Sequence, residues 1–215
     1  MAIQAGSVPR EGKPPHSGFY CATETATNLS TPAELVNSPV IASVTTLEAF
    51  EIALLAPTRV LCILTGNPLT LPTLLKRARD CGKLCMANMD FLDGLSRDRF
   101  AVEFLAANGV AGIVSTRAET LKAAQNMGLM TVLRTFAIDT AAVMAAKKSL
   151  GQLHPDAVEV LPSMAAPRAG KYLREVYPDL TILGGGLIET VREIEELIAA
   201  GVSAITTSNT RLWLI

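Results

Sequence analysis

From about Ser38 to the end of the chain, short apolar runs alternate with segments whose apolar residues recur at helical spacing. Eight of these runs are rich in residues that favour strands: Val40–Val44, Val60–Leu64, Leu84–Asp90, Gly112–Ser115, Thr131–Phe136, Ala157–Leu161, Thr181–Leu183 and Ala204–Thr207. Near-continuous apolar strands are typical of parallel sheets, because helices cover both of their faces. The regular alternation of strands and helices therefore predicts a parallel α/β fold.

The segments between the strands carry helix start and stop signals. The first begins with Thr45-Thr46-Leu47-Glu48, which predicts a capping box. Eight regular units without a dinucleotide-binding fingerprint favour a single small (β/α)8 TIM-type barrel over a doubly wound open sheet. The eighth helix is reduced to Thr210–Ile215, which leaves one side thinly covered unless the N-terminal extension or a second subunit packs there. Most of the helical segments end just before a glycine, the usual stop signal: Gly82, Gly109, Gly128, Gly151 and Gly201.

Residues 1–37 differ from the rest of the chain. Prolines, glycines and a stretch rich in threonine, serine and asparagine interrupt any period there. Such a composition predicts a flexible N-terminal extension. Residues 38–215 would then form one ligand-binding barrel domain.

Composition narrows the class of protein. The chain has 215 residues, of which 49% are hydrophobic and 18% charged, and its formal net charge is −1. This balance lacks the overall basic character that nucleic-acid binders usually carry. No apolar run is long enough to span a membrane and no secretory pattern opens the chain, so we expect a cytoplasmic protein. Four cysteines without paired spacing and two distant histidines predict buried thiols, with neither a metal nor a cofactor.

The loops after the seventh and eighth strands are predicted to bind phosphate, as they often do in barrels of this type. Glycines in the first loop would let backbone N–H groups approach an anion closely, and hydroxyl and amide side chains in the second would add donors. A glycine run alone also marks a tight turn, so the prediction rests on both loops together. The predicted phosphate-binding residues are Gly184, Gly185, Gly186, Thr207, Ser208 and Asn209.

Polar residues of the middle strands are candidates for the rest of the pocket. Asn88 and Asp90 share one face of the third strand by period-two alternation. Glu159 lies in the sixth strand, where a carboxylate needs a partner, and Arg134 of the fifth strand is the candidate. This pair is either a structural ion pair or a ligand contact. Arg117, at the end of the fourth strand, either caps a helix or reaches an anion.

Groups for acid–base catalysis are scarce. Asp90 and Glu159 are the candidates at the predicted mouth, no lysine falls within a predicted strand, and His154 precedes the sixth strand at the opposite end. This inventory favours a binding protein over an enzyme. Two alternatives stay open: a phosphosugar isomerase or aldolase that uses the two carboxylates, and a phosphate-binding barrel that acts through a protein partner.

Several local strings together resemble the glycerol-uptake operon antiterminator family. Their order and spacing match across essentially all of the chain after Ser38, and they are Asn88–Gly94, Gly112–Arg117, Ile138–Thr140, Glu159–Pro162, Gly184–Gly186 and Thr206–Trp213. Three positions depart from the family pattern. Asn88 stands where histidine is usual, Thr45 where a basic residue is usual, and Ser163 where glycine is common.

The resemblance implies a regulator without chemical turnover that responds to glycerol 3-phosphate, binds leader mRNA and prevents transcription termination of glycerol-use genes. It makes Gly185, Gly186, Ser208 and Asn209 the phosphate cradle, and it places Asp90, Arg117 and Glu159 near the glycerol moiety. The oligomeric state stays open, a homodimer included. Basic groups available for RNA, which are otherwise ordinary solvated helix faces, are Lys76, Arg77, Arg79, Lys83, Arg97, Arg99, Lys147 and Lys148.

Overall fold

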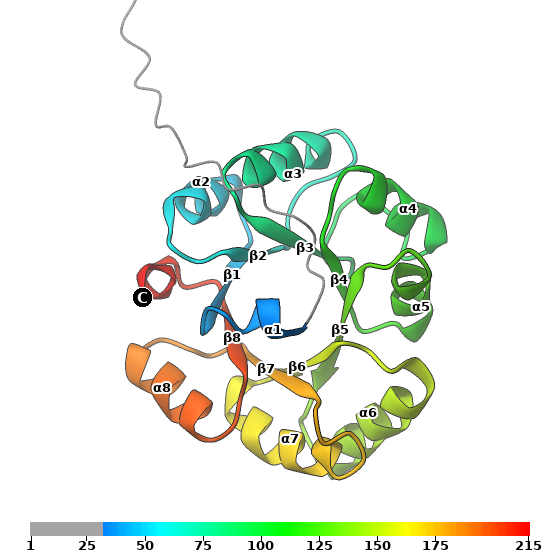
Figure 1. The fold of residues 1–215 in the computed structure, drawn as a ribbon, viewed down its shortest axis with the longest axis vertical. Coiled ribbons are helices and arrows are strands. Elements are labelled where there is room, and N and C mark those ends of the chain that lie inside the picture. Colours follow the sequence, from blue (N-terminus) through cyan, green and yellow to red (C-terminus); the bar gives the residue numbers. More distant parts are fainter. Residues whose placement is uncertain (1–31) are drawn as a thin grey trace, which may run out of the picture.

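The computed structural model describes residues 32–215, which form a closed barrel of eight parallel strands inside a ring of helices (Figure 1). Each strand pairs with the next along the chain, and β8 closes the barrel by pairing with β1. The predicted TIM-type barrel is confirmed, although β3 ends two residues earlier and β7 two residues later than the pattern indicated. The strands are β1 Val40–Val44, β2 Val60–Ile63, β3 Leu84–Asn88, β4 Gly112–Ser115, β5 Met130–Phe136, β6 Ala157–Leu161, β7 Thr181–Gly185 and β8 Ala204–Thr207.

The outer ring is made of seven helices that follow the first seven strands. The hydroxyl of Thr46 caps the first of them by accepting a hydrogen bond from the Ala49 amide at 3.1 Å. The capping box predicted at Thr45–Glu48 is therefore wrong by one residue, whereas a full capping box joins Thr190 and Glu193 at α8. The helices are α2 Leu47–Leu55, α3 Leu71–Asp80, α4 Arg99–Ala107, α5 Ala118–Asn126, α6 Thr140–Leu153, α7 Ala166–Arg174, preceded by the 3₁₀ turn η1 Ser163–Ala165, and α8 Val191–Ala199.

The strands separate two apolar layers. Successive side chains of a strand point to opposite faces, so Val40 and Ala42 of β1 pack outward against the helices while Ile41 points into the barrel. The interior is filled by aliphatic and sulfur side chains such as Met86 and Val132, as expected for a packed barrel core. Because both faces are buried, the strands read as continuous apolar runs.

A short helix, α1 (Pro32–Leu35), closes the end of the barrel where the strands begin. It lies at the centre of the ring in Figure 1, directly before β1, and Leu35 is fully buried in the barrel interior. The packed barrel therefore starts before Ser38. The remainder of the predicted extension, residues 1–31, lies outside the described residues.

The sequence predicted that almost no helix follows the last strand, and this is confirmed. β8 is followed only by a 3₁₀ turn, η2 (Thr210–Leu214), which contacts β1 and α2. Trp213 is fully buried, and its indole Nε1 donates a hydrogen bond to the Thr207 carbonyl at 2.8 Å. The chain's own C-terminus thus covers the side that was expected to be thinly covered.

Candidate functional site

A hollow of about 370 Å³ opens at the carboxyl ends of the strands, beside β7 and β8. We call it the β7–β8 hollow. Its position is the one at which barrels of this type usually bind ligands, because the loops that follow the strands converge there. Its lining comes from the ends of six strands or the loops after them: Ser43, Thr45, Leu64, Arg134, Leu161, Gly186, Leu187, Ile188, Glu189, Thr206, Thr207, Ser208 and Asn209.

Backbone donors line the hollow on the side of the β7 loop. Gly186 and Leu187 have φ angles of 77° and 58°, a left-handed conformation that glycine adopts freely and leucine rarely does. The N–H groups of Gly186, Leu187, Ile188 and Ser208 donate to no acceptor within residues 32–215. Consecutive unpaired amides of this kind form a concave site for an anion.

The loop after β8 is held in place by its own side chains. The hydroxyl of Thr207 accepts a hydrogen bond from the Asn209 amide at 3.1 Å. The Asn209 side chain in turn accepts from the Arg211 amide at 3.2 Å and donates to the Glu189 carbonyl at 3.4 Å, which ties the two loops together. Ser208, between them, is exposed and leaves its amide and hydroxyl for a ligand.

An ion pair lies beneath the hollow. Arg134 of β5 and Glu159 of β6 are partners in the strand register, and their Nε and Oε2 atoms are 2.8 Å apart. The Nε–H of Arg134 is not oriented to donate a hydrogen bond to Glu159, so the two side chains interact through their opposite charges. The other carboxylate oxygen accepts a hydrogen bond from the Thr206 hydroxyl at 2.5 Å. The predicted pairing of Arg134 with Glu159 is confirmed, and both side chains are at least nine-tenths buried.

Position 185 requires glycine because of the hydrogen bond between Thr206 and Glu159, and not because it lies in a loop. A Cβ at Gly185 would lie 2.5 Å from Thr206 Oγ1 and 2.9 Å from Glu159 Oε1. Both distances are shorter than real Cβ contacts allow, so any side chain there must displace the hydrogen-bonded pair. Gly184 and Gly185 therefore belong to the wall of β7, and only Gly186 begins the loop.

We expect Gly185→Ala to lower the free energy of unfolding by about 1–3 kcal/mol, the usual cost of overpacking a core. Gly184→Ala is the matched control, because its Cβ would meet the nearest atom, a side-chain methyl of Ile205, at 3.3 Å. Urea denaturation of both variants tests the prediction. Equal loss in the two variants would contradict it.

A second hollow, of about 270 Å³, opens beside the first at the ends of β3, β4 and β5. We call it the β3–β5 hollow. Arg134 lines both hollows and so lies between them. The rest of the lining consists of Asp90, Phe91, Arg97, Thr116, Arg117 and Phe136.

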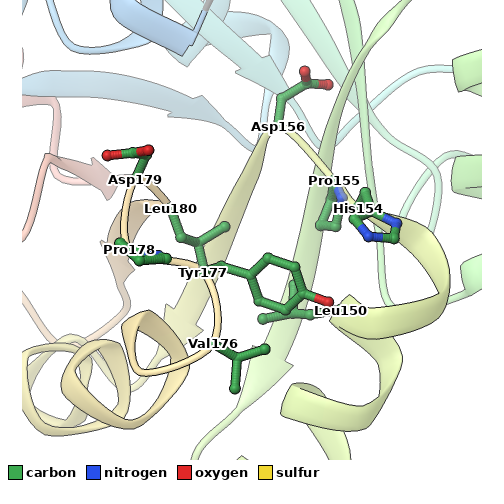
Figure 2. Close-up of a pocket in the computed structure, with 9 residues that line it drawn as sticks. All are labelled: Leu150, His154, Pro155, Asp156, Val176, Tyr177, Pro178, Asp179 and Leu180. Carbon is green, nitrogen blue, oxygen red and sulfur yellow. The ribbon is translucent and has the colours of Figure 1, made fainter.

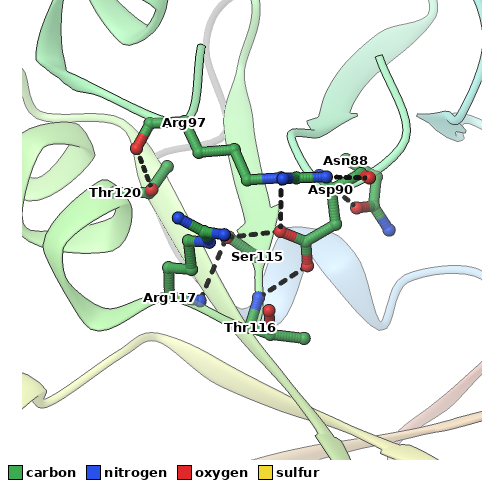
Figure 3. Close-up of polar contacts among 7 residues, drawn as sticks. All are labelled: Asn88, Asp90, Arg97, Ser115, Thr116, Arg117 and Thr120. Atoms are coloured by element: carbon green, nitrogen blue, oxygen red, sulfur yellow. Dashed lines mark hydrogen bonds and ion pairs between the residues drawn. The ribbon is translucent and has the colours of Figure 1, made fainter. Parts of the chain in front are cut away.

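Asp90 organises one side of the β3–β5 hollow (Figure 3). Its carboxylate accepts hydrogen bonds from the Ser115 hydroxyl at 3.1 Å and the Thr116 amide at 2.8 Å. Arg97 lies against it, with Nε 3.6 Å from the carboxylate and Nη2 2.8 Å from the Asp90 carbonyl. Both carboxylate oxygens are thus engaged, which leaves Asp90 poorly placed to act as a general base.

Asn88 lies deeper, fully buried at the end of β3. Its side-chain oxygen accepts a hydrogen bond from the Asp90 amide at 3.1 Å, while its amide nitrogen has no partner in the described part of the chain. Because β3 ends at Asn88, the period-two alternation that placed Asn88 and Asp90 on one face does not extend to Asp90.

The sequence-predicted site residues are divided by the structure into three groups. Gly186, Thr207, Ser208 and Asn209 line the β7–β8 hollow with Arg134. Asp90 and Arg117 line the β3–β5 hollow with Arg134. The others lie in the barrel wall or interior: Asn88, Glu159, Gly184 and Gly185.

Sequence reasoning did not select several lining residues. Ser43 and Thr206 lie in strands that otherwise read as apolar core, and the only signal was a hydroxyl near the carboxyl end of the strand. Phe91 and Phe136 are likewise not among the predicted site residues. In the structure each is 52% exposed.

Other chemistry is sparse in the described residues. Burial raises the pKa of the Cys62 thiol well above its ordinary value and that of Cys85 to about 12, so both stay protonated at neutral pH and are poor nucleophiles. Residues 32–215 contain no cluster of histidine, cysteine or acidic side chains that could hold a metal ion. No helix in the same range is long and apolar enough to cross a membrane.

A further hollow of about 350 Å³ lies at the opposite end of the barrel, where α6 and α7 finish (Figure 2). The rings of His154 and Tyr177 meet there edge to face, 5.7 Å apart. The carboxylate of Asp156 accepts hydrogen bonds from both the amide and the hydroxyl of Thr131 at 2.8 Å. In barrels of this type the end at which the strands begin serves stability, and His154 lies there as the sequence predicted.

Comparison with known sequences gives two results. The sequence model of the family described as "Glycerol-3-phosphate responsive antiterminator" matches residues 40–213. The uncharacterized protein YgcP of Escherichia coli (strain K12) is 30% identical over 182 residues, which are 84% of this chain and 94% of that protein.

Comparison with solved structures points to the same family as the comparison of sequences. A glycerol uptake operon antiterminator-related protein from Thermotoga maritima is 31% identical with a TM-score of 0.75, over 83% of this chain and 99% of that one. A glycerol uptake operon antiterminator regulatory protein from Listeria monocytogenes is 29% identical with a TM-score of 0.76, over 82% and 95%. A deoxyribose phosphate aldolase from Aeropyrum pernix is 13% identical with a TM-score of 0.63, over 87% and 92%, a likeness that concerns the fold alone.

Proposed function

The chain belongs to the family of glycerol-3-phosphate responsive antiterminators, and from this premise we propose that it binds glycerol 3-phosphate in the β7–β8 hollow. We further propose that the ligand-bound protein binds the leader mRNA of glycerol-use genes and prevents transcription termination, in the cytoplasm and without chemical turnover. Such control requires the ligand to bind the RNA-competent state more tightly than the other state.

The observation that carries the ligand proposal is the set of unpaired amides in residues that line the β7–β8 hollow. Gly186, Leu187, Ile188 and Ser208 present N–H groups that donate to nothing else in the described residues. Arg134 lines the same hollow. Backbone donors at close range and a fixed cation are the usual means of holding a phosphate, and the volume of about 370 Å³ suits a small metabolite.

The remaining lining suits the glycerol end of the ligand. Ser43 and Thr45 contribute polar groups from β1 and the residue after it. The family's usual basic residue at Thr45 is missing here, so the positive charge falls to Arg134. Hydroxyl groups of the ligand would face these side chains while the phosphate faces the β7 loop.

The two carboxylates at the mouth of the barrel, Glu159 and Asp90, are poorly placed for catalysis, which supports a regulatory role over chemical turnover. Both oxygens of Glu159 are engaged, by Arg134 and Thr206, and both oxygens of Asp90 by Ser115, Thr116 and Arg97. A general acid or base needs an oxygen that reaches the substrate. None of the eight strands carries a lysine, so a strand-borne Schiff base of the aldolase kind has no candidate.

Calorimetric titration of the protein with glycerol 3-phosphate tests the ligand proposal, with glycerol and inorganic phosphate as controls. We expect saturable binding of glycerol 3-phosphate and much weaker binding of the other two. Ser208→Glu should raise the Kd at least about tenfold, because a carboxylate among the amides repels the phosphate. Ser208 is exposed and its hydroxyl makes no hydrogen bond in the described residues, so stability should not change.

The control is Ser149→Glu, at a partly exposed serine on α6 that lines neither hollow and whose hydroxyl donates to the Ala145 carbonyl. It should leave the Kd unchanged. Absence of glycerol 3-phosphate binding to the wild-type protein would overturn the ligand proposal.

A further inference from the structure

The β3–β5 hollow combines arginines with exposed aromatic rings, and the proposed ligand does not account for it. Phe91 and Phe136 are each half exposed although they are large and apolar. The guanidinium carbon of Arg134 lies 5.2 Å from the centre of the Phe91 ring, so ring and cation are stacked. Both rings line a hollow of about 270 Å³, and the Phe136 ring is half exposed there without a cation over it in the described residues.

Not every arginine around the β3–β5 hollow has a partner among the described residues. Arg97 is paired with Asp90 and Arg134 with Glu159. Arg117 lines the same hollow, and its guanidinium has no hydrogen bond or ion pair within residues 32–215. Its side chain is exposed, at the point where β4 gives way to α5. The Arg117 guanidinium is therefore available for an anion that approaches the β3–β5 hollow from solvent.

We propose that the β3–β5 hollow binds one unpaired nucleotide of an RNA strand, and this rests on the RNA-binding function proposed above. The base stacks on the exposed ring of Phe136, and the backbone phosphate pairs with Arg117. Proteins that recognise single-stranded RNA combine these two elements, because every base has a face that stacks and every nucleotide carries a phosphate. Among the basic clusters on the helices, Arg77 lies over Phe50, whose ring is fully buried, and Arg99 lies over Phe100, whose ring is exposed and which serves as a control.

Arg134 gives the site a physical link to the ligand. Its side chain lines both hollows, and it is nine-tenths buried between Glu159 and Phe91. A ligand in the β7–β8 hollow and a nucleotide in the β3–β5 hollow would therefore meet at one guanidinium. Because Arg134 belongs to both sites, the variants that test the nucleotide site must avoid it.

Fluorescence anisotropy with a labelled, degenerate 12-nucleotide single-stranded RNA, at saturating glycerol 3-phosphate, provides the test. Phe136→Ala should weaken binding at least about fivefold, the lower end of the range for loss of one stacked base. Arg117→Gln should weaken binding and also reduce the slope of log K against log salt by about 0.7, since one phosphate contact is lost. Phe136→Ala should leave that slope unchanged, which a merely structural effect would not predict.

Arg99 and Phe100 on α4 supply matched controls. They form an exposed arginine–phenylalanine pair at 5.9 Å that lines neither hollow. Arg99→Gln and Phe100→Ala should leave RNA binding unchanged. Wild-type affinity in the Arg117 and Phe136 variants, or an equal loss in the Arg99 and Phe100 variants, would overturn the proposed site.

Failure of this inference is distinguishable from failure of the proposed function. Arg117 and Phe136 do not line the β7–β8 hollow, so both variants should bind glycerol 3-phosphate like the wild-type protein in calorimetry. If the wild-type protein binds glycerol 3-phosphate but no RNA, the nucleotide site is overturned while the ligand site stands. If it binds RNA through Phe136 but no glycerol 3-phosphate, the nucleotide site stands and the ligand proposal is overturned.

Discussion

Replacing Arg134 with methionine is expected to lower the free energy of unfolding by about 3–5 kcal/mol, the usual cost of removing one partner from a buried ion pair. Glu159 would remain 2% exposed, with the Thr206 hydroxyl as its one hydrogen-bond donor. The carboxylate would lose the cation that lies 2.8 Å away. Urea denaturation measures the loss, and the same variant should no longer bind glycerol 3-phosphate because the hollow loses its cation.

The double variant Arg134→Met/Glu159→Gln separates the lost pair from lost packing. Glutamine still accepts the Thr206 hydrogen bond but carries no charge, so most of the lost stability should return. Ligand binding should stay lost, since the cation is still missing. Failure of the double variant to regain stability would show that the charge of Glu159 is not the cause.

An exposed ion pair provides the comparison for Arg134. Arg192 and Glu196 lie 2.8 Å apart on α8, with side chains that are 86% and 61% exposed. Arg192→Met should change the free energy of unfolding by at most about 1 kcal/mol, as for surface pairs in general. A loss as small in Arg134→Met would mean that burial does not set the strength of the Arg134–Glu159 pair.

The barrel could be predicted from the sequence because its physical cause is local. Each strand is covered on both faces and so reads as an apolar run, and each helix ends near a glycine or a turn. The Arg134–Glu159 pair could be predicted for a related reason. A carboxylate in an apolar strand requires a partner, and the neighbouring strand of a parallel barrel offers one arginine.

The details of the mouth depend on tertiary contacts that no local pattern encodes. Gly184 and Gly185 look like a loop in sequence, yet both belong to β7, and position 185 is glycine because the Thr206–Glu159 hydrogen bond leaves no room for a Cβ there. Leu187 adopts a left-handed conformation that leucine rarely favours. The division of the mouth into two hollows follows from where the long Arg134 side chain lies, which depends on Phe91 in the loop after β3 and on Glu159 of β6.

Trp213→Ala is the second change for which we expect a large effect, a loss of about 3–5 kcal/mol in the free energy of unfolding. Trp213 is fully buried in η2, which stands in place of an eighth helix. Removing the indole opens a cavity beside β1 and α2, and the Thr207 carbonyl loses the hydrogen bond from Nε1. Trp213 is the only tryptophan in the chain, so unfolding should be followed by far-ultraviolet circular dichroism.

The Trp213 variant should also affect the ligand site, because Thr207 ends β8 and its hydroxyl holds the Asn209 amide. Once the indole no longer fixes the Thr207 carbonyl, the Ser208 amide loses its fixed position and glycerol 3-phosphate should bind more weakly. Leu214→Ala is the control, since Leu214 lies in the same turn but is 65% exposed. A Trp213 variant as stable as the Leu214 variant would mean that η2 does not substitute for the missing helix.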